Sequence, residues 1–467
     1  MKDWNPSHFL DVAEMATAVA TGYDWLYPSL TPAQRQTYSQ ALIEKALKPA
    51  KHIYDSNGWW SRPRNNWAQV CGAGIAIAAA AVAENEPELT RSLFESGRNL
   101  IQKCGQFYQP DGMYSEGPTY WHYGSNYHVM FLAAAAALGE ASADDPILRL
   151  AGDSIMHLTS PTRLSYNFAD GTAGLETPSP AQSWLAVRYQ DAGQAQHVRS
   201  LFQRAWEEGR GKIKHDRYFP LSVLWLPAPA EAVPRSNAAV FLGEQSMALF
   251  RSGWAAHDVF FAIKGGTAAA SHAHMDVGSF VFDAHGQRWI HDLGAENYNL
   301  PAYFGNKRWS YYRLQNRAHS TLEIDGKLQD PSAKPSPVTR STLAGESYEA
   351  TLDLSAAYAG SAANVIRHAS FDAGTGATKI RDEVTRPSGD VVWRAFTDAK
   401  PEIRGDEVIL RKKDQEITLR KSPGSGTWSI RDAKPPTTEE NQNEGISVVT
   451  LTAAKADRVK IEVEINP

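Results

Sequence analysis

Cysteine is nearly absent from the sequence, with Cys71 and Cys104 the only two in 467 residues. A framework of disulfides therefore cannot hold the fold together, and these two cysteines lack the spacing of a metal-binding pair. We expect no disulfide bond between them. The chain must be stabilised by hydrophobic cores, and its length predicts two domains, or three.

Long hydrophobic runs are missing as well. The stretch AGIAIAAAAVA at residues 73–83 ends at Glu84 and falls short of the roughly 18 residues that a membrane-spanning helix needs, so we expect a core helix there. The opening stretch MKDWNPSHFLDVAEM has no basic and then apolar leader. We therefore expect a removed leader or a truncated chain, and a periplasmic or secreted protein.

Neither sign of charge dominates, because 47 Lys and Arg face 52 Asp and Glu, for a net charge of −5. Such a balance gives no overall field that would attract nucleic acid or a membrane surface, so any anion binding must be local. Aromatic residues are plentiful, with 14 Trp and 18 Tyr. Their rings fill large cores, and where they are exposed they can stack on the faces of sugars.

The first half of the sequence has a helical pattern. Asn5 and Pro6 suit an N-cap and a first helical turn, and apolar residues then recur every three or four positions to Leu26. Similar Ala- and Leu-rich periodicity predicts further helices. They cover residues 33–49, 67–83, 88–107, 121–139, 146–157, 180–191 and 194–208.

The second half changes character after the proline-rich stretch LWLPAPAEAVPRS at residues 224–236, which predicts a linker. Short β-branched or aromatic runs such as DVFFAIKGG, VVWRAFTDA and RVKIEVEI follow, separated by turn residues. This pattern is typical of an antiparallel β-sandwich. We therefore predict an α+β multidomain chain, with a helical domain at 1–224, a linker at 225–236 and a β-domain at 237–467.

The stretch SHAHMDVGSFVFDAHGQRWIHDLG, residues 271–294, predicts a β-hairpin. His285 and Gly286 suit a two-residue turn. Ala284 would then face Gln287, and the same register would place residue 279 opposite Asp292. The hairpin thus brings Asp292 back toward the start of the stretch.

Two histidines and a carboxylate, with a fourth position left to water, are a common zinc shell. Gly278 permits the bend that would bring His272 and His274 toward Asp292, and His319, at the start of another predicted strand, is the best third ligand from elsewhere in the chain. The alternative is that these histidines are only satisfied by backbone groups. The His-x-His-x-Asp spacing also opens the metallo-β-lactamase signature, but that signature needs another His where Val277 stands.

Two stretches of the helical half carry candidate binding groups. SRPRNNWAQ concentrates Arg62, Arg64, Asn65 and Asn66 before a predicted helix, where an anion can bind, although one asparagine could merely cap that helix. PDGMYSEGPTYWHYGSNYH places polar and aromatic groups in a turn that leads into a helix; they are Glu116, Tyr120, Trp121, His122, Tyr123 and Tyr127. Since the three tyrosines recur at helical spacing, we expect at least one in the core.

Together these pieces resemble the heparinase II/III-like polysaccharide lyases. The resemblance rests on NNWAQV, DGMYSEGPTYWHYG, NFADG, HAHMDVGSFVFDAHGQRWIHDLG and YYRLQNRAHSTLEIDG, in that order. It implies an N-terminal incomplete (α/α) toroid followed by a C-terminal antiparallel β-sandwich. It also implies one zinc ion on His274, Asp292 and His319 with a structural role, which leaves His272 for catalysis.

The resemblance further implies that Asn65 or Asn66 neutralises a substrate carboxylate and that Tyr120 or Tyr123 moves protons. Trp67 follows the asparagines, so no histidine there can act as a base, and His272 or a tyrosine remains. Such a lyase removes the weakly acidic C5 proton of a uronate. Donors on the neighbouring carboxylate stabilise the resulting enolate by roughly 3 to 4 kcal/mol each.

We assign a set of charged and aromatic residues to substrate binding, namely Arg62, Arg64, Glu116, Trp121, His122, Tyr303 and Arg313. For Tyr303 and Arg313 the alternative is packing between domains.

The leading hypothesis is a lyase that leaves a 4,5-unsaturated uronate on an acidic polysaccharide or oligosaccharide such as a glycosaminoglycan or alginate. The alternatives are a glycoside hydrolase using Glu116 and Asp170, a zinc-dependent hydrolase, or a carbohydrate-binding protein with an inactivated site. We expect neither a nucleic acid nor a membrane as partner and leave a homodimer open.

Overall fold

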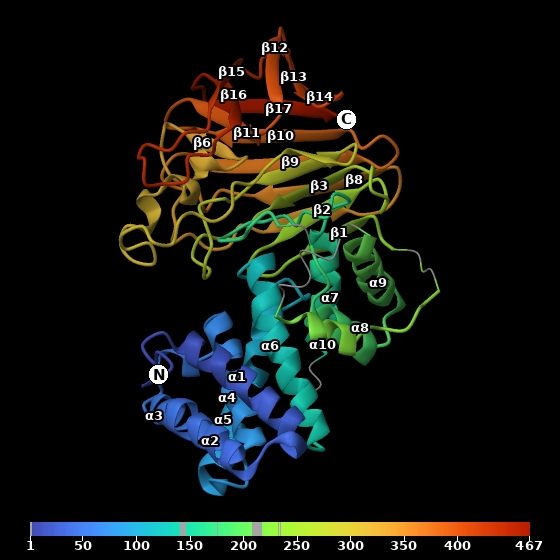
Figure 1. The fold of residues 1–467 in the computed structure, drawn as a ribbon. Coiled ribbons are helices and arrows are strands. Elements are labelled where there is room, and N and C mark those ends of the chain that lie inside the picture. The colour runs from blue at the N-terminus through green and yellow to red at the C-terminus, as the bar shows by residue number, and fades with distance from the viewer. Residues whose placement is uncertain (1, 141–145, 175, 208–216, 232, 234) are drawn as a thin grey trace. The chain divides into compact units, whose positions relative to one another are not determined.

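A computed structural model describes residues 2–140, 146–174, 176–207, 217–231, 233 and 235–467 (Figure 1). Contacts divide the chain into two compact units. The helical unit comprises Met1–Gln109, Tyr120–Gly152 and Thr177–Ala232, and the β-unit comprises Pro110–Thr119, Asp153–Glu176 and Val233–Pro467. Two segments from the predicted helical half therefore group with the strands.

The predicted helices are present. They are α1 (Phe9–Leu26), α2 (Pro32–Leu42), α4 (Asn66–Ala81), α5 (Pro87–Cys104), α6 (Pro118–Ala137), α7 (Ile147–Leu158), α8 (Pro180–Arg188) and α9 (Ala192–Glu207). The helix α3 (Lys48–Asp55) lies mostly beyond the stretch predicted to end at residue 49, and α10 (Phe219–Leu224) is not predicted. Among the described residues no helix is long and apolar enough to cross a membrane. Cys71 and Cys104 are both buried thiols, not halves of a disulfide.

Helix α4 is the centre of the helical unit, because it packs against both α1 and α5 (Figure 1). Small residues make this close approach possible. A Cβ atom on Gly74 would lie 2.7 Å from the Ala13 carbonyl oxygen of α1, and one on Gly97 of α5 would lie 2.7 Å from the Gly72 carbonyl oxygen. The Ala- and Gly-rich sequence of α4 is therefore a packing requirement.

The start of the first helix and the helix predicted at 33–49 differ from the prediction. Asn5 does not cap α1, because its backbone has φ +59° and its side chain binds Asp11 instead; His8 precedes the first turn. The single helix predicted at 33–49 is divided by a π-helical turn at Ile43–Leu47. Residue 208 of the last predicted helix, and residues 232 and 234 of the predicted linker, lie outside the described residues.

The β-unit contains three antiparallel sheets within the described residues. The five-stranded sheet runs in order β1 (Ala238–Phe241), β2 (Met247–Arg251), β3 (Phe260–Lys264), β4 (Phe280–Ala284) and β5 (Gln287–Ile290). The eight-stranded sheet has the order β12 (Lys400–Arg404), β13 (Glu407–Lys412), β14 (Gln415–Lys421), β17 (Arg458–Asn466), β10 (Thr378–Thr385), β9 (Asn364–Asp372), β8 (Ser347–Asp353) and β7 (Val338–Thr342). The four-stranded sheet has the order β15 (Thr427–Asp432), β16 (Ser447–Ala453), β11 (Val391–Thr397) and β6 (Leu322–Ile324).

The predicted β-sandwich is confirmed by one hydrophobic core that joins residues of all three sheets. The Phe250 ring on β2 lies 5.8 Å from the Tyr348 ring on β8 and 6.1 Å from the Phe371 ring on β9. Strands β8, β9 and β10 alternate buried and more exposed residues, as expected for a sheet with one face on the core. Strands β2, β3 and β4 are buried throughout, so their sheet is covered on both faces.

The hairpin of β4 and β5 confirms the predicted turn and corrects its register. His285 and Gly286 both have positive φ, +53° and +73°, as a type I′ turn requires, and Ala284 faces Gln287. The predicted pairing of residues 279 and 292 is wrong because a β-bulge shifts the register by one, so that Phe282 pairs with Ile290. The bulge coincides with Trp289, which is fully buried and whose indole N–H donates to the Ala284 carbonyl oxygen at 3.0 Å.

A buried ion pair crosses the large sheet directly. Arg367 on β9 faces Asp382 on β10, with Nε–Oδ1 and Nη2–Oδ2 distances of 2.7 Å, and both side chains are fully buried. Arg367 also donates to the carbonyl oxygen of Gly278 at 2.5 Å. The pair thus connects the sandwich core to the bend that precedes β4.

We predict that Asp382→Ala will lower the free energy of unfolding by about 3 to 5 kcal/mol, because it leaves the Arg367 charge buried without its partner. Urea unfolding followed by tryptophan fluorescence measures this change. Glu402→Ala is the control, since it removes an exposed carboxylate paired with Arg404 and Arg411 and should change stability little. An unchanged unfolding midpoint for Asp382→Ala would show that the pair does not stabilise the fold.

Candidate active site around His272

The loop between β3 and β4 carries the candidate catalytic and metal-binding histidines. It is irregular, and two residues with left-handed backbone conformation, His272 (φ +61°) and Gly278 (φ +84°), reverse its direction. A non-glycine residue rarely adopts positive φ unless its surroundings hold it there. The Asp170 backbone N–H donates to the His272 carbonyl oxygen at 3.0 Å, which ties the loop to the segment that carries NFADG.

Asp170 is the centre of this site. Its Oδ2 lies 2.9 Å from His272 Nδ1 and 3.1 Å from Arg308 Nη2, and its Oδ1 lies 2.9 Å from His274 Nε2 and 2.5 Å from the Tyr303 hydroxyl. Burial alone would raise the pKa of Asp170. The hydrogen bonds from His272 and His274 and the charge of Arg308 outweigh burial and hold the pKa of this carboxyl well below its ordinary value.

The other side of the His272 ring faces a second carboxylate. His272 Nε2 lies 3.6 Å from Glu116 Oε2, and the Glu116 side chain is almost fully buried, with its Oε1 accepting a 3.1 Å hydrogen bond from the Tyr114 hydroxyl. The His272 side chain is 11% exposed and its ring meets the edge of Phe304 at 5.8 Å. The His272 ring is therefore hydrogen-bonded at Nδ1 and has the Glu116 carboxylate near Nε2, while it keeps some access to solvent.

Two residues that the sequence assigned to substrate binding hold the β-unit together. The Tyr303 hydroxyl donates to Asp170, and burial together with that negative charge raises the pKa of Tyr303. Arg313 donates to the carbonyl oxygens of Leu293 and Ala295 and to the side chain of Asn443. Both side chains thus have hydrogen-bond partners inside the β-unit.

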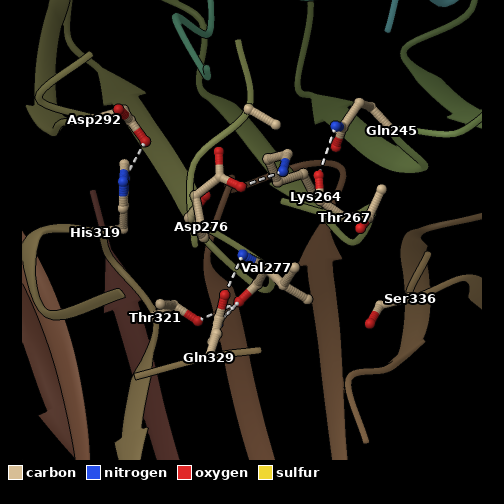
Figure 2. A network of polar contacts seen from close by, with 12 residues as sticks. Gln245, Lys264, Thr267, Asp276, Val277, Asp292, His319, Thr321, Gln329 and Ser336 are labelled. Carbon is tan, nitrogen blue, oxygen red and sulfur yellow. Dashed lines mark hydrogen bonds and ion pairs between the residues drawn. The ribbon is translucent and has the colours of Figure 1, made fainter. Parts of the chain in front are cut away.

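The three predicted zinc ligands also lie in the β-unit. The His274 and His319 rings have centroids 5.3 Å apart, and His319 Nδ1 lies 2.9 Å from Asp292 Oδ2 (Figure 2). His274 Nδ1 and His319 Nε2 are buried with no hydrogen-bond partner within the described residues. Among the described residues, no group of three or more His, Cys, Asp or Glu side chains is arranged so that it could hold a metal ion.

A buried polar network underlies this loop (Figure 2). Lys264 and Asp276 are fully buried and form an ion pair at 2.5 Å. Gln329 accepts from the Val277 backbone N–H at 3.1 Å and donates to the Val277 carbonyl oxygen at 2.8 Å, and the Thr321 hydroxyl donates to that same oxygen at 2.7 Å. These contacts fix the backbone between His274 and β4.

In the helical unit, the stretch before α4 has mainly structural partners. Asn65 caps α4, because its side-chain oxygen accepts from the Trp67 backbone N–H at 3.1 Å, which confirms the capping alternative for one asparagine of the pair. Asn66 is the first residue of α4 and is almost fully buried. The Arg62 guanidinium binds the Asn57 carbonyl oxygen at 2.8 and 3.0 Å, whereas Arg64 is exposed.

The aromatic residues at the start of α6 differ in burial. Tyr120 and His122 are partly exposed, and Trp121 is fully buried. The Tyr123 hydroxyl donates to Glu14 Oε1 at 2.5 Å, and burial together with that carboxylate raises the pKa of Tyr123. Tyr127 is 2% exposed, which confirms that at least one tyrosine of the series is in the core.

The contacts of Asp170 and Arg308 with the His272 loop are not predicted from the sequence. The sequence marks Asp170 only as part of NFADG and as a candidate hydrolase carboxylate, because its hydrogen-bond partners lie about a hundred residues later and no local spacing reveals them. Arg308 donates to Asp170 and to the carbonyl oxygens of His272 and Ala273, at 2.9 and 3.0 Å. The only local sequence signal for Arg308 is that it lies in an aromatic-rich stretch between the predicted zinc ligands Asp292 and His319.

Comparison with known proteins agrees with this architecture. Residues 244–462 match the family model described as Heparinase II/III-like, C-terminal. A heparinase III structure aligns with a TM-score of 0.70 and 16% identity over 99% of this chain and 67% of its own length. The heparan sulfate lyase HepC from Pedobacter heparinus aligns at 0.66 and 13% over 99% and 68%, and a chondroitin AC lyase mutant from Streptomyces coelicolor A3 at 0.54 and 12% over 99% and 75%.

No curated protein sequence matches the chain closely enough to count as a relative. The structural alignments extend over nearly the whole chain, so they establish the predicted order of helical toroid and β-sandwich. Residues 244–462 are thus similar to the C-terminal domain of the heparinase II/III-like family, and the chain as a whole has the fold of the heparinase III structures.

Proposed function

We propose that this protein is a polysaccharide lyase that cleaves an acidic, uronate-containing polysaccharide or oligosaccharide by β-elimination. The observation that carries the proposal is the held histidine, with His272 Nδ1 on Asp170 and Nε2 beside Glu116, in a domain matched by the heparinase II/III-like model. The similar structures are named as a heparinase III, a heparan sulfate lyase and a chondroitin AC lyase, which supports a polyanionic sugar as substrate.

In the proposed reaction a base removes the proton from C5 of the uronate. The electron pair of that C–H bond forms the C4=C5 double bond, the C4–O bond breaks, and the leaving oxygen takes up a proton. His272 is the base, because an ionised carboxylate only accepts hydrogen bonds and Asp170 therefore requires the proton on Nδ1, which leaves Nε2 to exchange a proton. Tyr120 supplies the proton to the leaving oxygen.

The uronate carboxylate must be neutralised before the C5 proton is acidic enough to remove. Asn65 and Asn66 provide amide donors at the start of α4, where the helix dipole also favours an anion. The capping bond uses the Asn65 side-chain oxygen, so the amide nitrogen is the atom that can donate to a substrate. Exposed Arg64 offers a charge nearby in the same stretch.

The glycoside hydrolase alternative needs two carboxylates free to act on one glycosidic bond. Glu116 and Asp170 both contact His272. However, both oxygens of Asp170 already accept two hydrogen bonds each, which leaves no position for a sugar or a water. This geometry favours elimination over hydrolysis.

Purified polyuronates distinguish the two reactions directly. A lyase produces the ultraviolet absorbance of a 4,5-unsaturated uronate in step with chain cleavage, whereas a hydrolase releases reducing ends without that absorbance. A panel of heparan sulfate, chondroitin, hyaluronan and alginate would also identify the sugar. Cleavage without unsaturated product would overturn the proposal.

We also propose one zinc ion on His274, Asp292 and His319. The buried ring nitrogens without partners on the two histidines support it, as does the bond from His274 to Asp170, because metal-binding histidines usually give their second nitrogen to a carboxylate. Asp292 now binds His319 and would have to turn toward the metal. When bound, the zinc would serve to fix the histidine loops in place.

We predict that Tyr120→Phe will abolish nearly all turnover while the protein stays folded, since the change keeps the ring and deletes only the transferable proton. Initial rates of product absorbance measure turnover, and circular dichroism checks the fold. Tyr127→Phe on the same helix is the control and should retain activity. If Tyr120→Phe stays active and Tyr123→Phe does not, the proton donor lies one helical turn further along α6.

We predict about one zinc ion per chain in protein purified without added metal, held by a shell of this type. Elemental analysis measures the content, and a chelator should lower the melting temperature. Asp292→Ala should yield less soluble protein, because metal affinity contributes to folding. Asp398→Ala, which breaks the separate pair with His291, is the control that should retain zinc. Full activity in zinc-free protein would refute a required metal.

A further inference from the structure

The conformation of His272 is unusual enough to need a cause. Its φ of +61° is unfavourable for any residue with a side chain, and its ring is almost enclosed. Three hydrogen bonds hold it there. The His272 carbonyl oxygen accepts from the Asp170 backbone N–H at 3.0 Å and from Arg308 Nη2 at 2.9 Å, and the ring Nδ1 lies 2.9 Å from Asp170 Oδ2.

We propose that Asp170 is the positioning residue of this active site. It acts through His272 and fixes both the direction of the ring and the nitrogen that carries the proton. This inference rests on the proposed function, in which His272 Nε2 is the base. Without the Asp170 carboxylate, the ring would lose the partner that keeps the proton on Nδ1. The backbone N–H of residue 170 would still donate to the His272 carbonyl oxygen, so the effect of a side-chain substitution is confined to the ring.

Asp170 itself is held by donors from separate segments. Tyr303 and Arg308 approach from the loop after β5, and His272 and His274 from the loop before β4. Each carboxylate oxygen accepts two hydrogen bonds, so the carboxylate plane cannot rotate without breaking several of them. A carboxylate fixed in this way transmits its orientation to the His272 ring.

The same carboxylate also faces the proposed metal site. Its Oδ1 accepts from His274 Nε2, which leaves Nδ1 as the nitrogen available to a metal. Asp170 therefore orients two histidines, one proposed for catalysis and one proposed for zinc. A test must separate a direct effect on His272 from an indirect effect through the metal.

The test is Asp170→Asn in the full chain, which keeps the shape and replaces one acceptor oxygen by a donor. We expect kcat to fall about 100-fold or more, as when an orienting carboxylate is removed from a catalytic histidine, with KM changed less than about threefold. Long-range ¹H–¹⁵N spectra should show His272 protonated on Nδ1 in the wild type and a changed tautomer in the variant, with the His272 signal assigned by its loss in His272→Gln.

Asp283→Asn is the matched control. Asp283 is another fully buried carboxylate of the β-unit, which accepts from Ser160, Thr162 and Arg288, and its loss should leave kcat and the His272 spectrum unchanged. If Asp170→Asn proves insoluble, Tyr303→Phe removes one donor from Asp170 and keeps the charge. It should then shift the His272 signal and lower kcat severalfold.

Several outcomes would overturn the proposal. Wild-type kcat in Asp170→Asn would do so, and so would an unchanged His272 tautomer. Recovery of kcat in Asp170→Asn on addition of excess zinc would show that Asp170 acts through the metal instead. An active His272→Gln enzyme would refute His272 as the base, and with it the proposed mechanism, even if Asp170→Asn were inactive.

Discussion

A buried negative charge that must be fully hydrogen-bonded constrains the whole site. Moving a carboxylate out of water is costly unless donors replace the water, and Asp170 obtains four of them from the loops before β4 and after β5. Each of those loops must therefore adopt one conformation for the charge to be tolerated. The demand explains how an irregular loop can hold His272 at positive φ.

The strands give that loop a rigid base. Three sets of contacts hold the backbone between His274 and β4 in place. They are the Lys264–Asp276 ion pair, the hydrogen bonds of Gln329 with Val277, and the hydrogen bond from Arg367 to the Gly278 carbonyl oxygen. These groups are buried and paired, so their geometry is costly to disturb. Functional side chains are held most accurately where a loop is anchored to a packed scaffold in this way.

Sequence patterns predicted the helices and turns whose conformation depends on residues close together in the chain. The helical periodicity located α1, α2 and α4 to α9 but missed most of α3, and the His285–Gly286 turn set the start of the β4–β5 pairing correctly. The Trp289 bulge was not predictable, because it depends on the space available to that indole in the core. In β9 and β10 the apolar alternation is a weak signal, since Arg367 and Asp382 occupy inward positions and interrupt it. In the site, histidine and aspartate spacing drew attention to His272 and His274, but the partner Asp170 lies too far along the chain for any spacing rule.

The assignment of residues 153–176 to the β-unit has a consequence for biosynthesis. The carbonyl oxygens of His157 and Ser165 accept hydrogen bonds from the buried guanidinium groups of Arg251 and Arg288, yet this segment leaves the ribosome well before β2 and β5 exist. A growing chain folds from its N-terminus as it emerges, so these carbonyl oxygens gain their native partners only after β2 and β5 have been synthesised. The order in which the segments are translated therefore differs from the order in which they can assemble. A cut at the linker would also separate residues 153–176 from the β-unit to which they belong, so the two halves of the sequence are not interchangeable modules.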